Sequence, residues 1–181
     1  MPDGAQREHR LQRLADLEIT DFLGRVASTA PTPGAGPVGA FTLAMGVACA
    51  RKAIAITQKH IGPDPTFAAA DVQLESVLHA ACEGADRDAD RFSDLIAAMR
   101  LPHTNEAERD TRQATIRAAA AAVVAVAERL IGLGDTAREV ILSLKDRVDP
   151  VMAGDVNTAL RLIEANRAIQ SDNLAENSRL C

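Results

Sequence analysis

The sequence predicts an all-α fold, a bundle of five to six long antiparallel helices that we expect to dimerise. Alanine is very abundant over the 181 residues, and alanine loses no side-chain entropy on entering a helix. Segments that alternate apolar and polar residues, as strands do, are scarce. Aromatic residues amount to four Phe with no Tyr or Trp, so the core must be built from small and aliphatic side chains.

Residues 1–16 read as an N-terminal extension, and residues 17–181 as one helical domain, since domains commonly run to about 100–200 residues. A short amphipathic helix is expected over 16–29, where apolar residues recur at spacings of three and four. The segment PTPGAGP at 31–37 then breaks the helix, because three prolines and two glycines exclude regular helix there.

The next helix is expected from Pro37 to Lys59, with proline at its first position. It is apolar on most faces and should therefore be buried. After a break at 62–66, a long helix over 67–100 places apolar residues at steps that alternate four and three. That pattern is typical of a helix packed along a partner at a shallow angle.

Asn105 can cap a further helix, which we expect to end where Gly132 and Gly134 interrupt it. A short helix over 135–148 and a last helix over 151–179 complete the chain.

Composition excludes several classes of function. The net charge is −5 and stacking aromatics are lacking, which argues against nucleic-acid binding. The charged N-terminus is unlike a signal peptide, and the apolar run 114–127 is interrupted by Arg117 and too short to span a membrane. The three cysteines, Cys49, Cys82 and Cys181, lack zinc-type spacing, so we expect a reduced, cytoplasmic protein without a metal site.

Three features can carry chemistry. The first is the proline-glycine segment at 31–37, where glycines lead into a helix N-terminus. Exposed backbone N–H groups and the positive end of the helix dipole form a site for an anion or a carbonyl there. The alternative is a plain turn between two helices.

The second feature is an acidic stretch on the long helix, with Asp86, Asp90 and Asp94 four residues apart and Asp88 between them. Clustered or partly buried carboxylates have raised pKa values, which suits proton transfer near neutral pH. The alternative is a solvated face neutralised by the neighbouring arginines.

The third feature is a ladder of amides on the last helix: Asn166, Gln170, Asn173 and Asn177. Amides present paired donors and acceptors, so they can recognise a heterocycle with a urea- or guanidine-like edge, such as a pterin. The alternative is a solvated polar face.

Together these segments resemble one family, the cyclodeaminase domain of formiminotransferase-cyclodeaminase and the bacterial methenyltetrahydrofolate cyclohydrolases. DFLGRVASTAPTPGAGPVGA at 21–40 is similar to the family's opening "PTPGGGS" loop, and AMGVA at 44–48 to the helix that follows. DRDADRF at 86–92 and AMRLPHTN at 98–105 resemble its "DADAxAF" and "AMRLPKNT" segments. The resemblance extends over about 19–180.

The resemblance implies a folate-dependent enzyme acting at the N5–C–N10 amidine of tetrahydrofolate. Cyclodeaminases close a 5-formimino group onto N10 and expel ammonia, whereas cyclohydrolases add water to the 5,10-methenyl bridge. Either reaction takes a tetrahydrofolate derivative as substrate and needs no cofactor. Two alternatives stay open: a diverged homologue that binds or converts another heterocycle, and a non-catalytic helical binding dimer.

Matching the family's motifs residue by residue implies the site. Asp86 is the first candidate for the acid/base and Asp88 the second, with Lys59 near the reacting centre or the glutamate tail of the folate. The residues expected to bind substrate are Pro33, Gly34, Ala35, Gly36, Asp155, Asn173 and Asn177.

Overall fold

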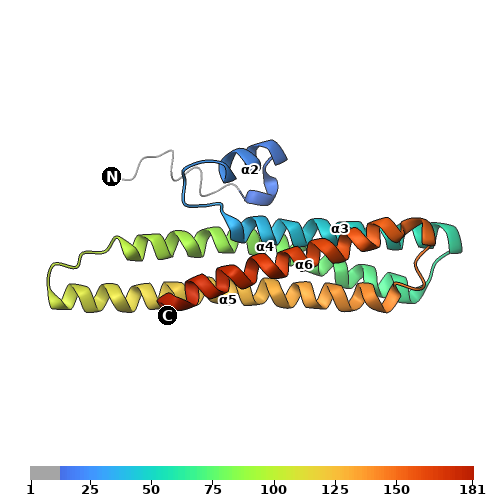
Figure 1. Ribbon diagram of the computed structural model, residues 1–181. Coiled ribbons are helices and arrows are strands. Elements are labelled where there is room, and N and C mark those ends of the chain that lie inside the picture. The colour runs from blue at the N-terminus through green and yellow to red at the C-terminus, as the bar shows by residue number, and fades with distance from the viewer. Residues whose placement is uncertain (1–12) are drawn as a thin grey trace.

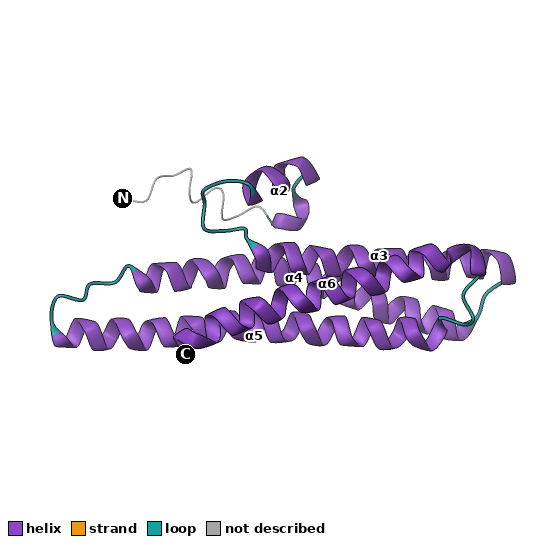
Figure 2. Cartoon of the chain, in the orientation of Figure 1, coloured by secondary structure: helices purple, strands orange, loops and turns teal. Residues whose placement is uncertain are grey.

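A computed structural model describes residues 13–181, which form five α-helices, three short 3-10 turns and no strand (Figures 1 and 2). The all-α prediction is confirmed; of the predicted extension, residues 1–12 lie outside the described part. The helices are α2 (Ile19–Val26), α3 (Ala35–Ile61), α4 (Pro65–Met99), α5 (Glu106–Leu144) and α6 (Ala153–Asn177). The 3-10 turns are η1 (Leu14–Asp16), η2 (Pro150–Met152) and η3 (Ser178–Leu180).

Helices α3 to α6 form an elongated four-helix bundle in which consecutive helices run in opposite directions (Figure 1). Each packs along two neighbours, so that α3 lies between α4 and α6, and α5 closes the other side. The short α2 lies above α3, held by an edge-to-face contact between Phe22 and Phe41 with ring centroids 4.9 Å apart.

Helix α3 is buried because small residues line its contact with α6. A Cβ atom at Gly46 would lie 3.0 Å from the carbonyl oxygen of Ala159, so glycine permits the two backbones to approach closely. By length and hydropathy α3 alone among the described helices could cross a membrane, and half of its apolar window is buried inside the bundle.

Two helices begin at caps that the sequence encodes. Asp64 accepts hydrogen bonds from the backbone N–H groups of Thr66 and Phe67, at 2.7 and 3.2 Å, at the start of α4. Asn105 accepts one from the N–H of Glu108 at 2.9 Å, so the predicted cap of α5 is confirmed. Such side chains satisfy N–H groups that have no partner within the helix.

The break predicted at Gly132 and Gly134 is wrong, because α5 continues through both residues for 39 residues, about 58 Å. The segment expected as a separate helix over 135–148 is mainly the C-terminal part of α5. Gly134 faces α6, where a Cβ would come within 3.2 Å of Nδ2 of Asn166. Packing against α6 therefore outweighs the roughly 1 kcal/mol that a glycine costs inside a helix.

Candidate functional site

The three polar features singled out from the sequence meet where α3 begins. The carboxyl group of Asp88, on α4, lies against Gly36, where a Cβ atom would overlap it. From the other side, Nε2 of Gln170 on α6 donates a 3.0 Å hydrogen bond to the carbonyl oxygen of Gly36. The first turn of α3 is thus held between a carboxyl group and an amide.

Asp88 is a buried carboxyl group, 7% exposed. Burial raises its pKa from an ordinary value of 3.8 to about 6, and no nearby cation or hydrogen-bond donor among the described residues offsets this. A carboxyl group with a pKa near working pH can both accept and return a proton. The buried position of Asp88 therefore gives its carboxyl group a pKa in the range that acid/base chemistry near neutral pH uses.

The proline-glycine segment supplies the start of α3. Gly34 is the N-cap, Ala35 is the exposed first helical residue, and Pro33 and Gly36 are buried. Proline was predicted at the first helical position, but Pro37 occupies the third, where its missing N–H also costs nothing because the first four N–H groups of a helix lack intrahelical partners.

Within residues 13–181, the hydroxyl of Thr32 is buried without a hydrogen-bond partner. It lies in the same loop, two residues before the N-cap Gly34. The loop therefore combines free N–H groups with a buried hydroxyl, and both are groups that a polar ligand can satisfy.

The amide ladder of α6 faces into the bundle rather than into solvent. Asn166 and Gln170 are fully buried, while Asn173 and Asn177 are half-buried. Nδ2 of Asn166 donates to the carbonyl of Leu130 at 3.2 Å, and its Oδ1 has no partner within the described residues. Gln170 belongs to the amide ladder but is not among the predicted substrate-binding residues. Its position one turn before Asn173 is the signal that could have identified it.

Asp86, the first acid/base candidate, lies on a different side of α4 from Asp88. Its carboxyl group accepts a 2.7 Å hydrogen bond from the backbone N–H of Leu14 and lies 3.4 Å from the guanidinium of Arg13. Two residues along an α-helix point roughly 200° apart, which separates the two aspartates. Asp86 thus fastens η1 to α4.

Lys59 and Asp155 lie toward the opposite end of the bundle from Gly36. Lys59 is exposed in the last turn of α3, 23 residues and therefore about 35 Å from Gly36. Asp155, in the first turn of α6, pairs with Lys52 at 3.4 Å. Within one chain, neither residue joins the cluster around Asp88.

Among residues 13–181, no group of three or more His, Cys, Asp or Glu side chains is placed to hold a metal ion. The groups that meet at the start of α3 are one buried carboxyl of raised pKa, the N–H groups of the first helical turn, and inward-facing amides. This combination can orient a polar heterocycle and move protons on it.

The chain is similar in sequence and in fold to known proteins of one family. The profile of the formiminotransferase-cyclodeaminase family matches residues 18–178. The formimidoyltransferase-cyclodeaminase of Sus scrofa is 31% identical over 145 residues, which make up 72% of this chain and 26% of the pig protein. The crystal structure of formiminotetrahydrofolate cyclodeaminase from Thermotoga maritima superposes with a TM-score of 0.79 at 21% identity, over 92% of this chain and 80% of that one.

Proposed function

Because the chain belongs to the formiminotransferase-cyclodeaminase family, we propose that it converts a 5-formiminotetrahydrofolate to the 5,10-methenyl form with release of ammonia. The observation that carries the proposal is the buried carboxyl of Asp88 beside the start of α3. The names of the two relatives support the choice of reaction.

Asp88 is proposed as the acid/base. In the first step N10 attacks the carbon of the protonated formimino group (N5–CH=NH2⁺), so that the C–N10 bond forms, the C=N electron pair moves to the formimino nitrogen, and the proton lost from N10 passes to the Asp88 carboxylate. The carbon then bears N5, N10 and an amino group. Asp88 returns the proton to that amino group, the C–N bond breaks, and ammonia leaves. A pKa near 6 suits a group that must first accept this proton and then return it.

The loop and the amides are proposed to orient the substrate. The N–H groups at the start of α3 would donate to a carbonyl or developing negative charge, and the half-buried Asn173 and Asn177 would contact the pterin edge. Gln170 holds the loop against α6 through its bond to Gly36 and so acts by positioning. Asp86, tied to η1, is proposed to be structural rather than catalytic.

The test is turnover of 5-formiminotetrahydrofolate, followed by the appearance of methenyl absorbance and of free ammonia. Asp88→Asn keeps the shape of the side chain and removes the proton transfer, so kcat should fall by about a hundredfold or more. Asp90→Asn, an exposed carboxylate on the same helix, is the matched control and should retain activity. Equal rates for wild type and Asp88→Asn would refute the role of Asp88.

Hydrolysis of the 5,10-methenyl bridge to 10-formyltetrahydrofolate is the second candidate reaction. It passes through a tetrahedral carbon that bears two nitrogens, and the same Asp88 carboxylate would take a proton from the attacking water. Loss of methenyl absorbance above the buffer rate, without ammonia release, would identify this reaction. Binding of a folate with neither reaction would favour a non-catalytic homologue.

We also propose that the protein forms a homodimer. Several large apolar side chains stay exposed, including Ile19 at 69% and Leu23 at 58% on α2 and Val72 at 67% on α4. Covering such surface by a second copy would be favourable. Sedimentation equilibrium measures the mass directly, and a monomer at micromolar concentration would refute this proposal.

A further inference from the structure

The outer face of α3, which points away from the rest of the bundle, is apolar for most of its length. The residues at steps of three and four from Val38 to Lys59 lie on this face and are exposed or half-buried. Only Lys52 and Lys59 among them carry a charge. Helix α4, by contrast, has six exposed acidic or basic residues between Glu75 and Asp94. An apolar face of this length is typical of a surface that packs against another element.

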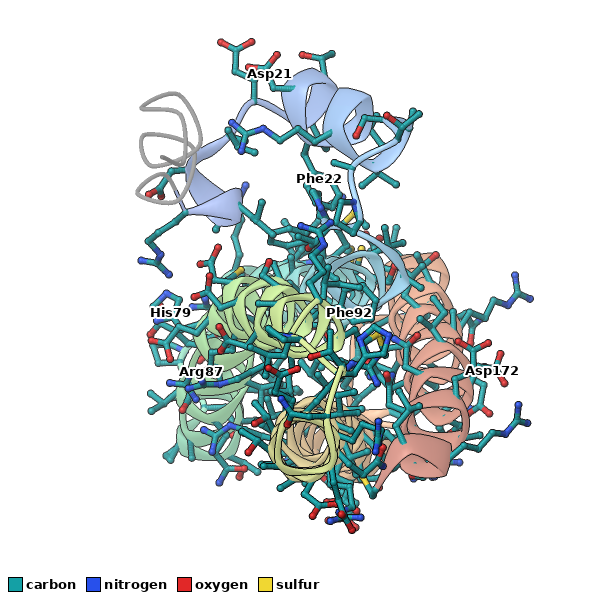
Figure 3. All side chains as sticks on the ribbon, turned by 90° about the vertical axis from the view of Figure 1, so that its left-hand side faces the viewer. Asp21, Phe22, His79, Arg87, Phe92 and Asp172 are labelled. Carbon is teal, nitrogen blue, oxygen red and sulfur yellow. The ribbon has the colours of Figure 1, made fainter. Side chains whose placement is uncertain are left out.

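Helix α2 covers only one end of this face. Figure 1 shows α2 over the start of α3 and no other described element over the rest of its length. In the end-on view of Figure 3, Phe22 points from α2 toward the bundle and Asp21 points away from it. Beyond the contact of Phe22 with Phe41, Met45 is 49% exposed. The face therefore has a raised end, formed by α2, and a bare apolar remainder.

The two ends of the face carry opposite charges. Glu18 and Asp21, at the start of α2, are exposed carboxylates, whereas Lys59 is an exposed cation in the last turn of α3. None of these three residues forms an ion pair with another residue of the described part of the chain. Lys52, nearer the middle, pairs with Asp155 at 3.4 Å. The raised end is thus acidic and the bare end basic.

This distribution favours a second copy of the chain in the antiparallel orientation. A parallel arrangement would bring the two α2 helices together and set acid against acid. In the antiparallel arrangement the acidic α2 of each copy meets the basic end of the other α3, and two-fold symmetry makes this contact twice. The exposed apolar side chains of α2, Ile19 and Leu23, then face the bare end near Ile56 of the partner subunit.

On the basis of the homodimer proposed above, and independently of the proposed reaction, we propose that the two copies pair through the outer faces of α3, crossing near Ala48. Ala48 is the midpoint of α3, and its small side chain permits two helices to approach closely. Two-fold symmetry then brings Ala48 and its neighbour Cys49 close to the same residues of the other copy.

The dimensions of the face agree with this arrangement. Lys59 lies 11 residues from Ala48, about 16 Å along the helix. At a crossing angle of about 50°, the commonest for packed helices, the axes are about 12 Å apart sideways at that distance, so the end of one α3 passes beside the α2 of the other copy. A strip about 40 Å long and about 20 Å wide covers roughly 800 Å² per copy, which is the size of a stable interface.

The first experiment measures the dimer Kd of the whole protein by sedimentation equilibrium. Ala48→Glu sets two carboxylates against each other at the two-fold axis, so the Kd should rise about a hundredfold. Ala48 is exposed in the single chain, so the variant should keep its helix content by circular dichroism. The matched control is Ala121→Glu, an exposed alanine on α5, the helix that closes the side of the bundle opposite α3.

The second experiment tests the orientation by exchanging charges. Glu18→Lys and Lys59→Glu should each raise the Kd about tenfold at low salt, because each sets like charges together at two symmetric places. The double variant Glu18→Lys/Lys59→Glu should restore the wild-type Kd. Failure of the double variant to do so would overturn the antiparallel orientation.

The third experiment uses a native thiol. Cys82→Ser/Cys181→Ser leaves Cys49 as the remaining cysteine, and mild oxidation should then give a covalent dimer that a further Cys49→Ser abolishes.

The outcomes separate the proposals. A wild-type monomer would overturn the interface and the homodimer together. A dimer that neither responds to Ala48→Glu nor cross-links through Cys49 would overturn this interface and leave the homodimer to another surface. A dimer that behaves as expected but turns over no reduced folate would overturn the proposed reaction and leave the interface standing.

Discussion

Replacing Asp88 by Asn should remove the loss of stability that the wild-type carboxyl causes as pH rises, while it also removes activity. Burial raises the pKa of Asp88 from 3.8 to about 6, so the folded state binds this proton more tightly than the unfolded state does. The contribution of Asp88 to stability is therefore fully present below pH 3.8 and is lost as pH rises through about 6. At roughly 1.4 kcal/mol for each pKa unit, the loss by pH 8 is about 3 kcal/mol.

The assay is urea unfolding of wild type and Asp88→Asn at pH 4 and pH 8, at one fixed protein concentration. Asparagine cannot ionise, and its shape and polarity resemble those of the protonated acid. The cost of burying the amide is therefore common to both pH values and cancels in the comparison. The variant should gain about 2.4 kcal/mol on wild type between pH 4 and pH 8, because at pH 4 the unfolded chain is already partly ionised at this group; that corresponds to roughly 5–10 °C in Tm for a chain of this length.

Asp90→Asn controls for the loss of one negative charge from α4, since Asp90 is exposed on the same helix. If the stability difference between wild type and Asp88→Asn is the same at both pH values, burial does not disfavour the charged form of Asp88. Asp88 would then lack the raised pKa that a proton-transfer role requires.

Four further outcomes are expected. The kcat/KM of wild type should fall as pH drops through about 6, since the base form of Asp88 is required; a flat profile from pH 5 to pH 8 would exclude it. Gly36→Ala should cost about 1–3 kcal/mol in urea unfolding, because its methyl group overlaps the Asp88 carboxyl; a neutral result would contradict the packing. Gln170→Leu should cost about 0.5–1.5 kcal/mol, because it removes the 3.0 Å hydrogen bond that ties α6 to the first turn of α3; an unchanged Tm would argue against that bond. Gly132→Ala, which meets open space inside α5, should stabilise by up to about 1 kcal/mol, whereas Gly134→Ala should destabilise; equal effects would mean that α5 does not pack on α6 at Gly134.

Helix existence could be read from the sequence because periodicity and caps are local signals. Asn105 caps α5 as predicted. In α4 the alternating steps mark the buried Leu74, Ala81 and Ala85 but miss Leu95 and Ala98, which are also buried. The predicted helix end at Gly132 and Gly134 is wrong, because the sequence alone does not distinguish a glycine that ends a helix from a glycine that allows a neighbouring helix to approach. Only the position of Asn166 on α6 distinguishes them.

For the candidate site, too, the sequence predicted the region but not the individual residues. The spacing of the aspartates marked the region, but choosing between Asp86 and Asp88 needed the positions of Leu14 and Gly36, which are far away in sequence. Gln170 contacts the start of α3 because Gly36 lies opposite it, and Lys59 is distant from Gly36 because α3 is long. Contacts between residues that are far apart in the sequence determine where these side chains lie relative to Gly36. The local spacing of residues along the chain does not contain that information.

The overlap between a Cβ at Gly36 and the carboxyl of Asp88 makes the two positions dependent on each other over evolution. A larger residue at 36 should be tolerated best where the side chain at 88 is shorter, and an aspartate at 88 favours a glycine at 36. The defect of Gly36→Ala should accordingly be relieved by Asp88→Ala in the same chain. Among homologues, the two residues should be inherited as a pair, and a sequence that has lost one should have lost the proton chemistry with it.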